Sequence, residues 1–154
     1  MKSKKRCILI RSIKILEYGT TLMKQPLNYF KIKESNSKNQ KPALLMISGL
    51  KPIDMAGSKM LFEILKSAID ETEEMCILTK CYDIFIFVEM NPDGRLLGNS
   101  VYSACGNDLT QITEPSKVLH PEITQFHKVL KEIDLKHKIY ILIEFSDCWK
   151  SLIN

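Results

Sequence analysis

Histidines are the side chains in this sequence best suited to bind a metal, and there are three of them: His120, His127 and His137. His120 and His127 are seven residues apart with Glu122 between them, a spacing that places both imidazoles on about the same face of a helix. Two imidazoles and a carboxylate are a donor set that zinc accepts. Pro121, however, is a common first residue of a helix, and we expect histidines exposed on a helix surface rather than a metal site.

Two acidic residues and the cysteines are the other candidates for chemistry. Asp54 and Asp108 could form a pair for acid–base catalysis, but we expect Asp54 to cap a helix and Asp108 to accept hydrogen bonds from loop amides. Cys76 and Cys81 have no matching second pair, and structural zinc normally needs four ligands. An odd cysteine count without an export signal predicts reduced thiols in the cytosol. The cysteines are Cys7, Cys76, Cys81, Cys105 and Cys148.

Apolar periodicity predicts the elements that position these residues. A hairpin of Ile13–Leu16 and Leu27–Lys33 is followed by the polar loop Ser35–Lys41. Continuous apolar runs, typical of strands buried on both faces, are Ala43–Ile47, Tyr82–Val88 and Lys138–Ile143. Helical spacing is seen in Met60–Ile69, in Glu71–Thr79 and after Pro121, and Asn91–Gly94 reads as a turn. Strands alternating with amphipathic helices predict an α/β fold, a mixed β-sheet with helices on both faces.

Composition excludes several classes of protein. The 154 residues are 45% hydrophobic and 26% charged, which is typical of a folded globular domain. No apolar run approaches the roughly 20 residues that span a membrane. Lysines at the N-terminus and in Lys31–Lys41 account for much of the net charge of +4. They are not interleaved with aromatic residues as in nucleic-acid-binding surfaces, so we expect a cytoplasmic protein that binds neither nucleic acid nor membrane.

One stretch of motifs resembles a known family. It comprises Asn91-Pro92-Asp93-Gly94, Gly98-Asn99, Gly106-Asn107-Asp108-Leu109, Pro115-Ser116 and Leu119-His120-Pro121. Order and spacing resemble the zinc carboxypeptidases, and most closely their cytosolic branch, which removes glutamates from tubulin tails. The resemblance covers roughly Leu16 to Cys148. It implies the first half of a zinc carboxypeptidase domain, with residues 1–17 as a basic strand-like lead-in and residues 18–154 as the partial domain.

The resemblance also assigns positions to the family's zinc ligands. The family uses a histidine and a glutamate in one turn and a histidine after a later strand. These positions hold Lys51, Asp54 and Ser146 here. A lysine ammonium has no lone pair for a metal, an aspartate is one methylene shorter than a glutamate, and serine is a poor zinc ligand. Zinc is the cofactor of the family, and we expect none to be bound here.

The substrate-binding positions depart from the family as well. Two arginines of the family hold the terminal carboxylate of the substrate, and their positions hold Val101 and Gln111. The asparagine before the second arginine is Thr110. The family's catalytic glutamate would lie beyond Asn154.

We therefore expect no catalytic residue, and a family member that is degenerate and truncated. Lys51 could instead hold an acidic protein tail, such as that of tubulin, without cleaving it. Two further alternatives remain: a gene fragment without independent function, whose sheet would be left with an exposed edge, or a residual hydrolase that another chain completes.

Overall fold

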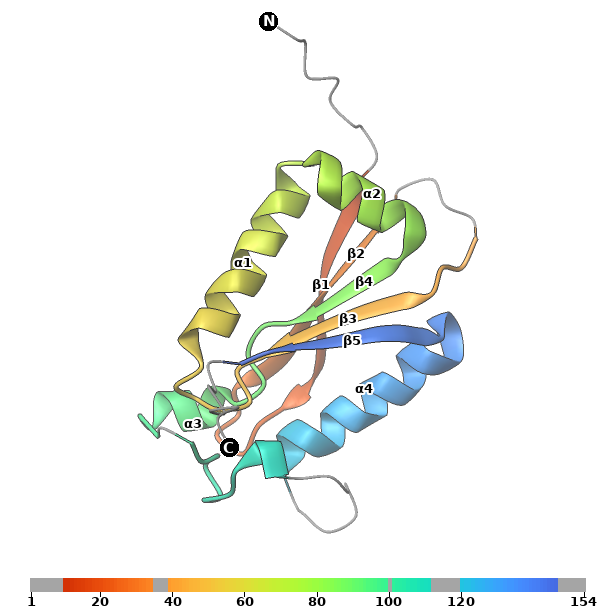
Figure 1. Cartoon of the computed structure of the whole chain (residues 1–154). Helices are drawn as coiled ribbons and strands as arrows, with labels where there is room; N and C mark the ends of the chain where they lie inside the picture. Colours follow the sequence, from red (N-terminus) through yellow and green to blue (C-terminus); the bar gives the residue numbers. More distant parts are fainter. Residues whose placement is uncertain (1–9, 35–38, 100, 112–119, 147–154) are drawn as a thin grey trace, which may run out of the picture.

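The computed structural model describes residues 10–34, 39–99, 101–111 and 120–146. Predicted features in residues 1–9, 35–38, 112–119 and 147–154 lie outside these ranges. They include the motif residues Pro115, Ser116 and Leu119. Figure 1 shows a sheet with α1 and α2 on one face and α4 on the other, as the sequence predicted.

The sheet is mixed and has five described strands. Their order is β1-β2-β4-β3-β5; β2 pairs antiparallel with β1 and β4, and β3 pairs parallel with β4 and β5. The strands are β1 (Ile10–Thr20), β2 (Pro26–Glu34), β3 (Ala43–Ser48), β4 (Asp83–Phe87) and β5 (Ile139–Phe145). The hairpin and the three apolar runs are thus confirmed. Strand β1 crosses the boundary placed between residues 17 and 18, so both sides of that boundary share one strand.

Helices α1 (Met55–Ile69) and α2 (Glu73–Cys81) pack on one face of the sheet. Both begin near their predicted positions, and Thr72 caps α2 by accepting a hydrogen bond from the Met75 amide. Their buried face joins alternate residues of the central strands in one apolar core. Its members include Leu61, Leu65, Ala68, Met75, Leu44, Met46, Ile84 and Ile86. Met60 and Ile69 are exposed instead, so the apolar stripe of α1 is narrower than its sequence indicated.

Helix α4 (Pro121–His137) covers the opposite face. Its predicted stripe of Ile123, Phe126, Val129 and Ile133 is buried, with Leu130 partly buried beside it. Phe126 meets Phe87 edge to face at 5.0 Å, and Tyr29 stacks on Phe87 at 5.0 Å. This aromatic cluster fixes α4 across the sheet.

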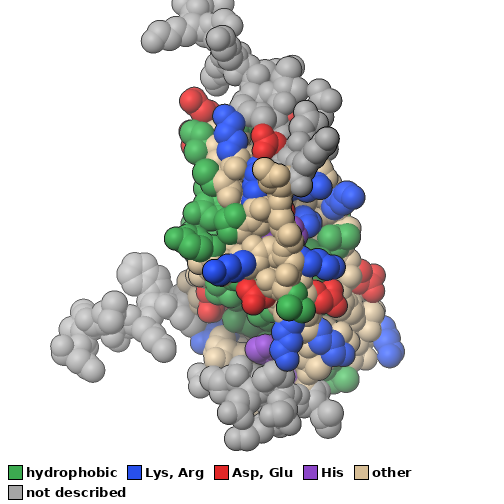
Figure 2. Space-filling model, turned by 90° about the vertical axis from the view of Figure 1, so that its right-hand side faces the viewer, with side chains coloured by type: hydrophobic (Ala, Val, Ile, Leu, Met, Phe, Trp, Pro, Cys, Tyr) green, Lys and Arg blue, Asp and Glu red, His purple; other side chains and the backbone are tan. Residues whose placement is uncertain are grey.

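Strand β5 forms one border of the sheet among the described strands. Tyr140, Leu142 and Ile143 are 68%, 47% and 37% exposed, as expected of a strand with one uncovered side. Figure 2 shows hydrophobic side chains (green) at the surface on one face, with lysines and acids interspersed. Within the described ranges, no helix has the length and apolar content needed to cross a membrane.

The turn predicted at Asn91–Gly94 is wrong in its detail. Asn91 is the N-cap of a short helix, α3 (Pro92–Leu96), and its Oδ1 accepts a hydrogen bond from the Gly94 amide at 3.0 Å. Proline as the first helical residue and asparagine as the cap are also signals of a helix start. The same four residues are therefore compatible with either a turn or a helix start. A single-turn helix, η1 (Leu109–Gln111), follows later.

Candidate functional site

The candidate site lies where β3 and β4 end, at their carboxyl edge, which is where open α/β sheets commonly place ligands. The turn after β3 holds Lys51 and Asp54, and the Asp54 amide donates to the Lys51 carbonyl at 3.0 Å. Asp54 is 1% exposed, whereas Lys51 is half-buried. Of the two charged residues in this turn, Lys51 is therefore the more exposed.

Asp54 is the N-cap residue of α1, as predicted, but its side chain makes no capping hydrogen bond. Its Oδ2 instead accepts a hydrogen bond from Ser146 Oγ at 3.3 Å. Ser146 comes directly after β5, 92 residues further along the chain. The fold thus places two of the three positions assigned to zinc ligands within one hydrogen bond of each other.

Gly57 allows this approach. A Cβ at Gly57 would lie 2.4 Å from the Phe145 carbonyl oxygen, a distance that real Cβ atoms do not adopt. The first turn of α1 and the end of β5 therefore meet backbone to backbone. This contact holds Asp54 and Ser146 together irrespective of what either side chain binds.

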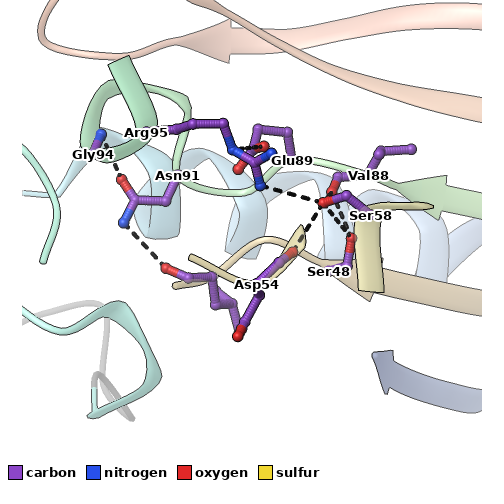
Figure 3. A network of polar contacts seen from close by, with 9 residues as sticks. Ser48, Asp54, Ser58, Val88, Glu89, Asn91, Gly94 and Arg95 are labelled. Atoms are coloured by element: carbon purple, nitrogen blue, oxygen red, sulfur yellow. Dashed lines mark hydrogen bonds and ion pairs between the residues drawn. The ribbon is translucent and has the colours of Figure 1, made fainter. Parts of the chain in front are cut away.

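Helix α3 supports the Lys51–Asp54 turn from the other side. Asn91 Nδ2 donates to the Leu50 carbonyl at 3.1 Å (Figure 3). A Cβ at Gly94 would meet Pro52 Cγ at 2.6 Å and the Tyr102 carbonyl at 2.5 Å. The motif that carries the family resemblance is therefore the part that positions the turn.

A polar network missed by the sequence analysis lies beside this turn (Figure 3). Ser48 Oγ and Ser58 Oγ both donate to the Val88 carbonyl, at 2.5 and 3.1 Å. Arg95 Nη2 donates to Ser58 Oγ at 3.4 Å, and its Nε lies 2.6 Å from Glu89 Oε2. Burial raises the pKa of Glu89 to about 7, with Arg95 acting in the opposite direction. Glu89 directly follows the apolar run Tyr82–Val88. An acidic residue at the end of a buried strand was the sequence signal that could have identified this network.

The substrate-side positions lie in the loop after α3 and in η1. Val101 is half-buried, and Thr110 donates through its amide and its hydroxyl to Asp108 Oδ1, at 3.0 and 2.7 Å. Asp108 thus accepts from a backbone amide, as predicted, but that amide belongs to the short helix η1 and not to a loop. The backbone of Gln111 belongs to η1, and its side chain lies outside the described part of the structure.

The expectation of exposed histidines is wrong for His120, which is 1% exposed. Asn107 Nδ2 lies 2.7 Å from its Nε2, and Ser103 Oγ lies 3.5 Å from its Nδ1. Burial lowers the pKa of His120. His120 thus links the start of α4 to the loop between α3 and η1, which contains Ser103 and Asn107. Among the described residues, no three His, Cys, Asp or Glu side chains converge so that they could hold a metal.

The sequence of this chain matches a known protein family. The model of the zinc carboxypeptidase family (Peptidase_M14) matches residues 11–129. No curated protein matches the chain.

Several solved structures share the fold. A metallo-carboxypeptidase from Burkholderia cenocepacia superposes with a TM-score of 0.70 and 18% identity over 86% of this chain and 35% of its own. A metallo-carboxypeptidase from Pseudomonas aeruginosa superposes with a TM-score of 0.71 and 20% identity over 88% of this chain and 34% of its own. Carboxypeptidase A from Helicoverpa armigera superposes with a TM-score of 0.71 and 17% identity over 86% of this chain and 40% of its own. The chain thus spans between a third and two fifths of these proteins, and its mixed sheet corresponds to part of a carboxypeptidase domain.

Proposed function

The chain belongs to the zinc carboxypeptidase family, and we propose that it keeps the framework of that family without its zinc-dependent hydrolysis. The observation that carries the proposal is the donor set Lys51, Asp54 and Ser146. An ammonium offers no lone pair, and a hydroxyl is a weak ligand for zinc. The one carboxylate is buried and already accepts a hydrogen bond from Ser146. These residues do not fit a zinc ion.

Zinc content is the direct test of this proposal. The purified chain, loaded with zinc and then passed over a weak chelator, should retain well under one zinc ion per chain. A variant with Asp54→Asn should retain the same amount, because the proposal gives Asp54 no role as a ligand. One tightly held zinc that disappears in Asp54→Asn would overturn the proposal and would require hydrolysis to be tested.

We further propose that the site binds acidic protein tails, such as glutamate-rich C-termini of the tubulin type, without cleaving them. Support comes from the exposure of the two charges in the turn, since Lys51 is half-buried and Asp54 is 1% exposed. Lys51 is thus the more accessible of the two charged residues to an anionic side chain that approaches from solvent. A partner of this kind is cytoplasmic, so the proposal places the protein there as well.

Binding of a short polyglutamate peptide at low salt tests this second proposal. Lys51→Gln should weaken binding several-fold, and added salt should weaken binding to the unmodified chain because the attraction is screened. Lys59→Gln, an exposed lysine on α1, is the matched control and should leave affinity unchanged. Equal losses in the two variants would mean that the net charge of the protein, and not this site, attracts the peptide.

A further inference from the structure

Lys31, His137 and Asp83 form a chain of hydrogen bonds near the start of β4, at the opposite end of that strand from the site just described. Lys31 Nζ lies 3.0 Å from His137 Nε2, and His137 Nδ1 lies 3.1 Å from Asp83 Oδ2. The three residues come from β2, from the last position of α4 and from the first position of β4. Lys31 and His137 are 106 residues apart in sequence, so only the fold brings them together.

The end of α4 places the imidazole. Lys138 adopts a left-handed backbone conformation at φ 51°, and its carbonyl accepts a hydrogen bond from the Ala43 amide at 3.0 Å. This ties the end of α4 to the start of β3. The His137 ring then meets the Phe85 ring edge to face at 5.3 Å, and Lys31 Nζ lies 5.0 Å from the centre of the same ring. The Phe85 ring therefore packs against both the imidazole and the lysine side chain.

The partners of His137 determine its tautomer. Nδ1 faces two acceptors, Asp83 Oδ2 and the Lys41 carbonyl at 3.4 Å, so Nδ1 carries the proton. Nε2 faces Lys31, and an ammonium can only donate. The lone pair of Nε2 therefore points at the lysine nitrogen. A carboxylate that orients an imidazole, which in turn accepts from a nucleophile, is the arrangement that activates nucleophiles in many enzymes.

Burial favours the neutral form of the Lys31 amine. Burial lowers the pKa of Lys31, and the nearby ammonium groups of Lys33, Lys136 and Lys14 lower it further, while Asp83 acts in the opposite direction. Burial and Lys31 likewise lower the pKa of His137, against the effects of Asp83 and the Lys41 carbonyl. Both nitrogens are thus shifted toward the forms in which one can attack and the other can accept a proton.

We propose that Lys31 is an activated amine nucleophile, oriented by His137 and Asp83, and that it is a site of acylation by thioesters and similar activated acyl donors. The amine lone pair attacks the acyl carbon and forms the C–N bond. The nitrogen of the adduct gives a proton to His137 Nε2, and Asp83 stabilises the imidazolium. The thiolate then departs and takes up that proton, leaving an amide on Lys31. Acylation would leave a neutral amide at a half-buried position among several lysines.

The test is competitive labelling of the intact folded chain with a small acetyl thioester and, separately, with an activated acetyl ester. Peptide mass spectrometry across a pH series gives the rate at each lysine. Lys33 on the same strand and Lys14 on the paired strand serve as internal controls. A positioned base typically contributes 10²–10⁴-fold in enzymes, and without a bound donor we expect Lys31 to react about tenfold faster than either control near neutral pH.

His137→Phe keeps a ring on Phe85 and removes the base. It should bring the rate at Lys31 down to that of Lys33, with Lys33 and Lys14 unaffected. A Lys31 that reacts no faster than its neighbours in the unmodified chain overturns the proposal without any variant, and it would leave these three residues as a structural ion pair. An unchanged Lys31 rate in folded His137→Phe would also overturn it.

Discussion

Introducing two histidines should create a zinc site, if the family's ligand positions converge in this chain as the geometry indicates. Lys51→His together with Ser146→His would give two imidazoles and the Asp54 carboxylate, the donor set of many hydrolytic zinc sites. Ligand atoms about 2.0–2.2 Å from a tetrahedral zinc lie roughly 3.4 Å apart. Ser146 Oγ and Asp54 Oδ2 are 3.3 Å apart, and Ser146 is exposed, which leaves room for the longer imidazole.

The expected size of the effect follows from binding linkage. Free zinc at about 100 times its dissociation constant stabilises the folded state by about 2.7 kcal/mol. At about 2–4 °C per kcal/mol for a chain of this size, thermal unfolding should shift upward by roughly 5–11 °C. Elemental analysis should find one zinc ion per chain, removable by a strong chelator.

Each single variant supplies one imidazole and one carboxylate and should shift by much less, and the unmodified chain should not shift. If the folded double variant takes up no more zinc than the unmodified chain, position 51 or 146 does not face the shared metal position. The reasoning from Asp54 and Ser146 would then be refuted.

Three further predictions concern the framework. Phe87→Ala should lower the free energy of unfolding in denaturant by about 3–5 kcal/mol, because Phe87 is fully buried against Tyr29 and Phe126. The control Phe62→Ala, at a position 56% exposed, should lower it by under about 0.5 kcal/mol. Equal losses of stability in the two variants would contradict the assigned core. Gly57→Ala should destabilise by about 1–3 kcal/mol through its clash with the Phe145 carbonyl, whereas Gly106→Ala, which meets nothing, should cost only its left-handed backbone, about 1 kcal/mol. Glu122 is 1% exposed, neither carboxylate oxygen has a hydrogen-bond partner in the described structure, and burial raises its pKa. Glu122 holds its proton more tightly in the folded state than in the unfolded state. Its contribution to stability is therefore complete below its ordinary pKa and is lost as the pH rises through the raised pKa. Glu122→Gln should flatten that part of the stability–pH curve, and an unchanged curve would show that Glu122 is ionised in the fold.

The sheet could be predicted because its signals are local. Each central strand is a run of apolar residues long enough to be recognised alone, and each helix repeats its apolar positions every three or four residues. Asn91–Gly94 was misjudged because turns and helix starts draw on the same residue types. His120 was misjudged for a different reason: its burial depends on Ser103 and Asn107 folding over it, and no periodicity in the sequence reports such a contact.

The side-chain clusters could not be predicted, because each joins residues that are distant along the chain. Ser146 meets Asp54 across 92 residues and Lys31 meets His137 across 106. Glu89 and Arg95 are close in sequence, but their pairing depends on how α3 turns back beside α1. A polar residue next to a buried strand was the only sequence signal for this group.

Family membership and catalytic chemistry rest on different residues in this fold. Asn91, Gly94 and Gly57 make contacts with backbone atoms of neighbouring segments. Those contacts fix the path of the chain around the site whatever side chains project from positions 51 and 146. A lysine or a serine at these positions therefore costs the fold little, whereas a side chain at Gly57 or Gly94 would force segments apart. Similarity that is carried by such framework residues establishes the fold, and only the donor atoms at the site decide whether zinc can be held there.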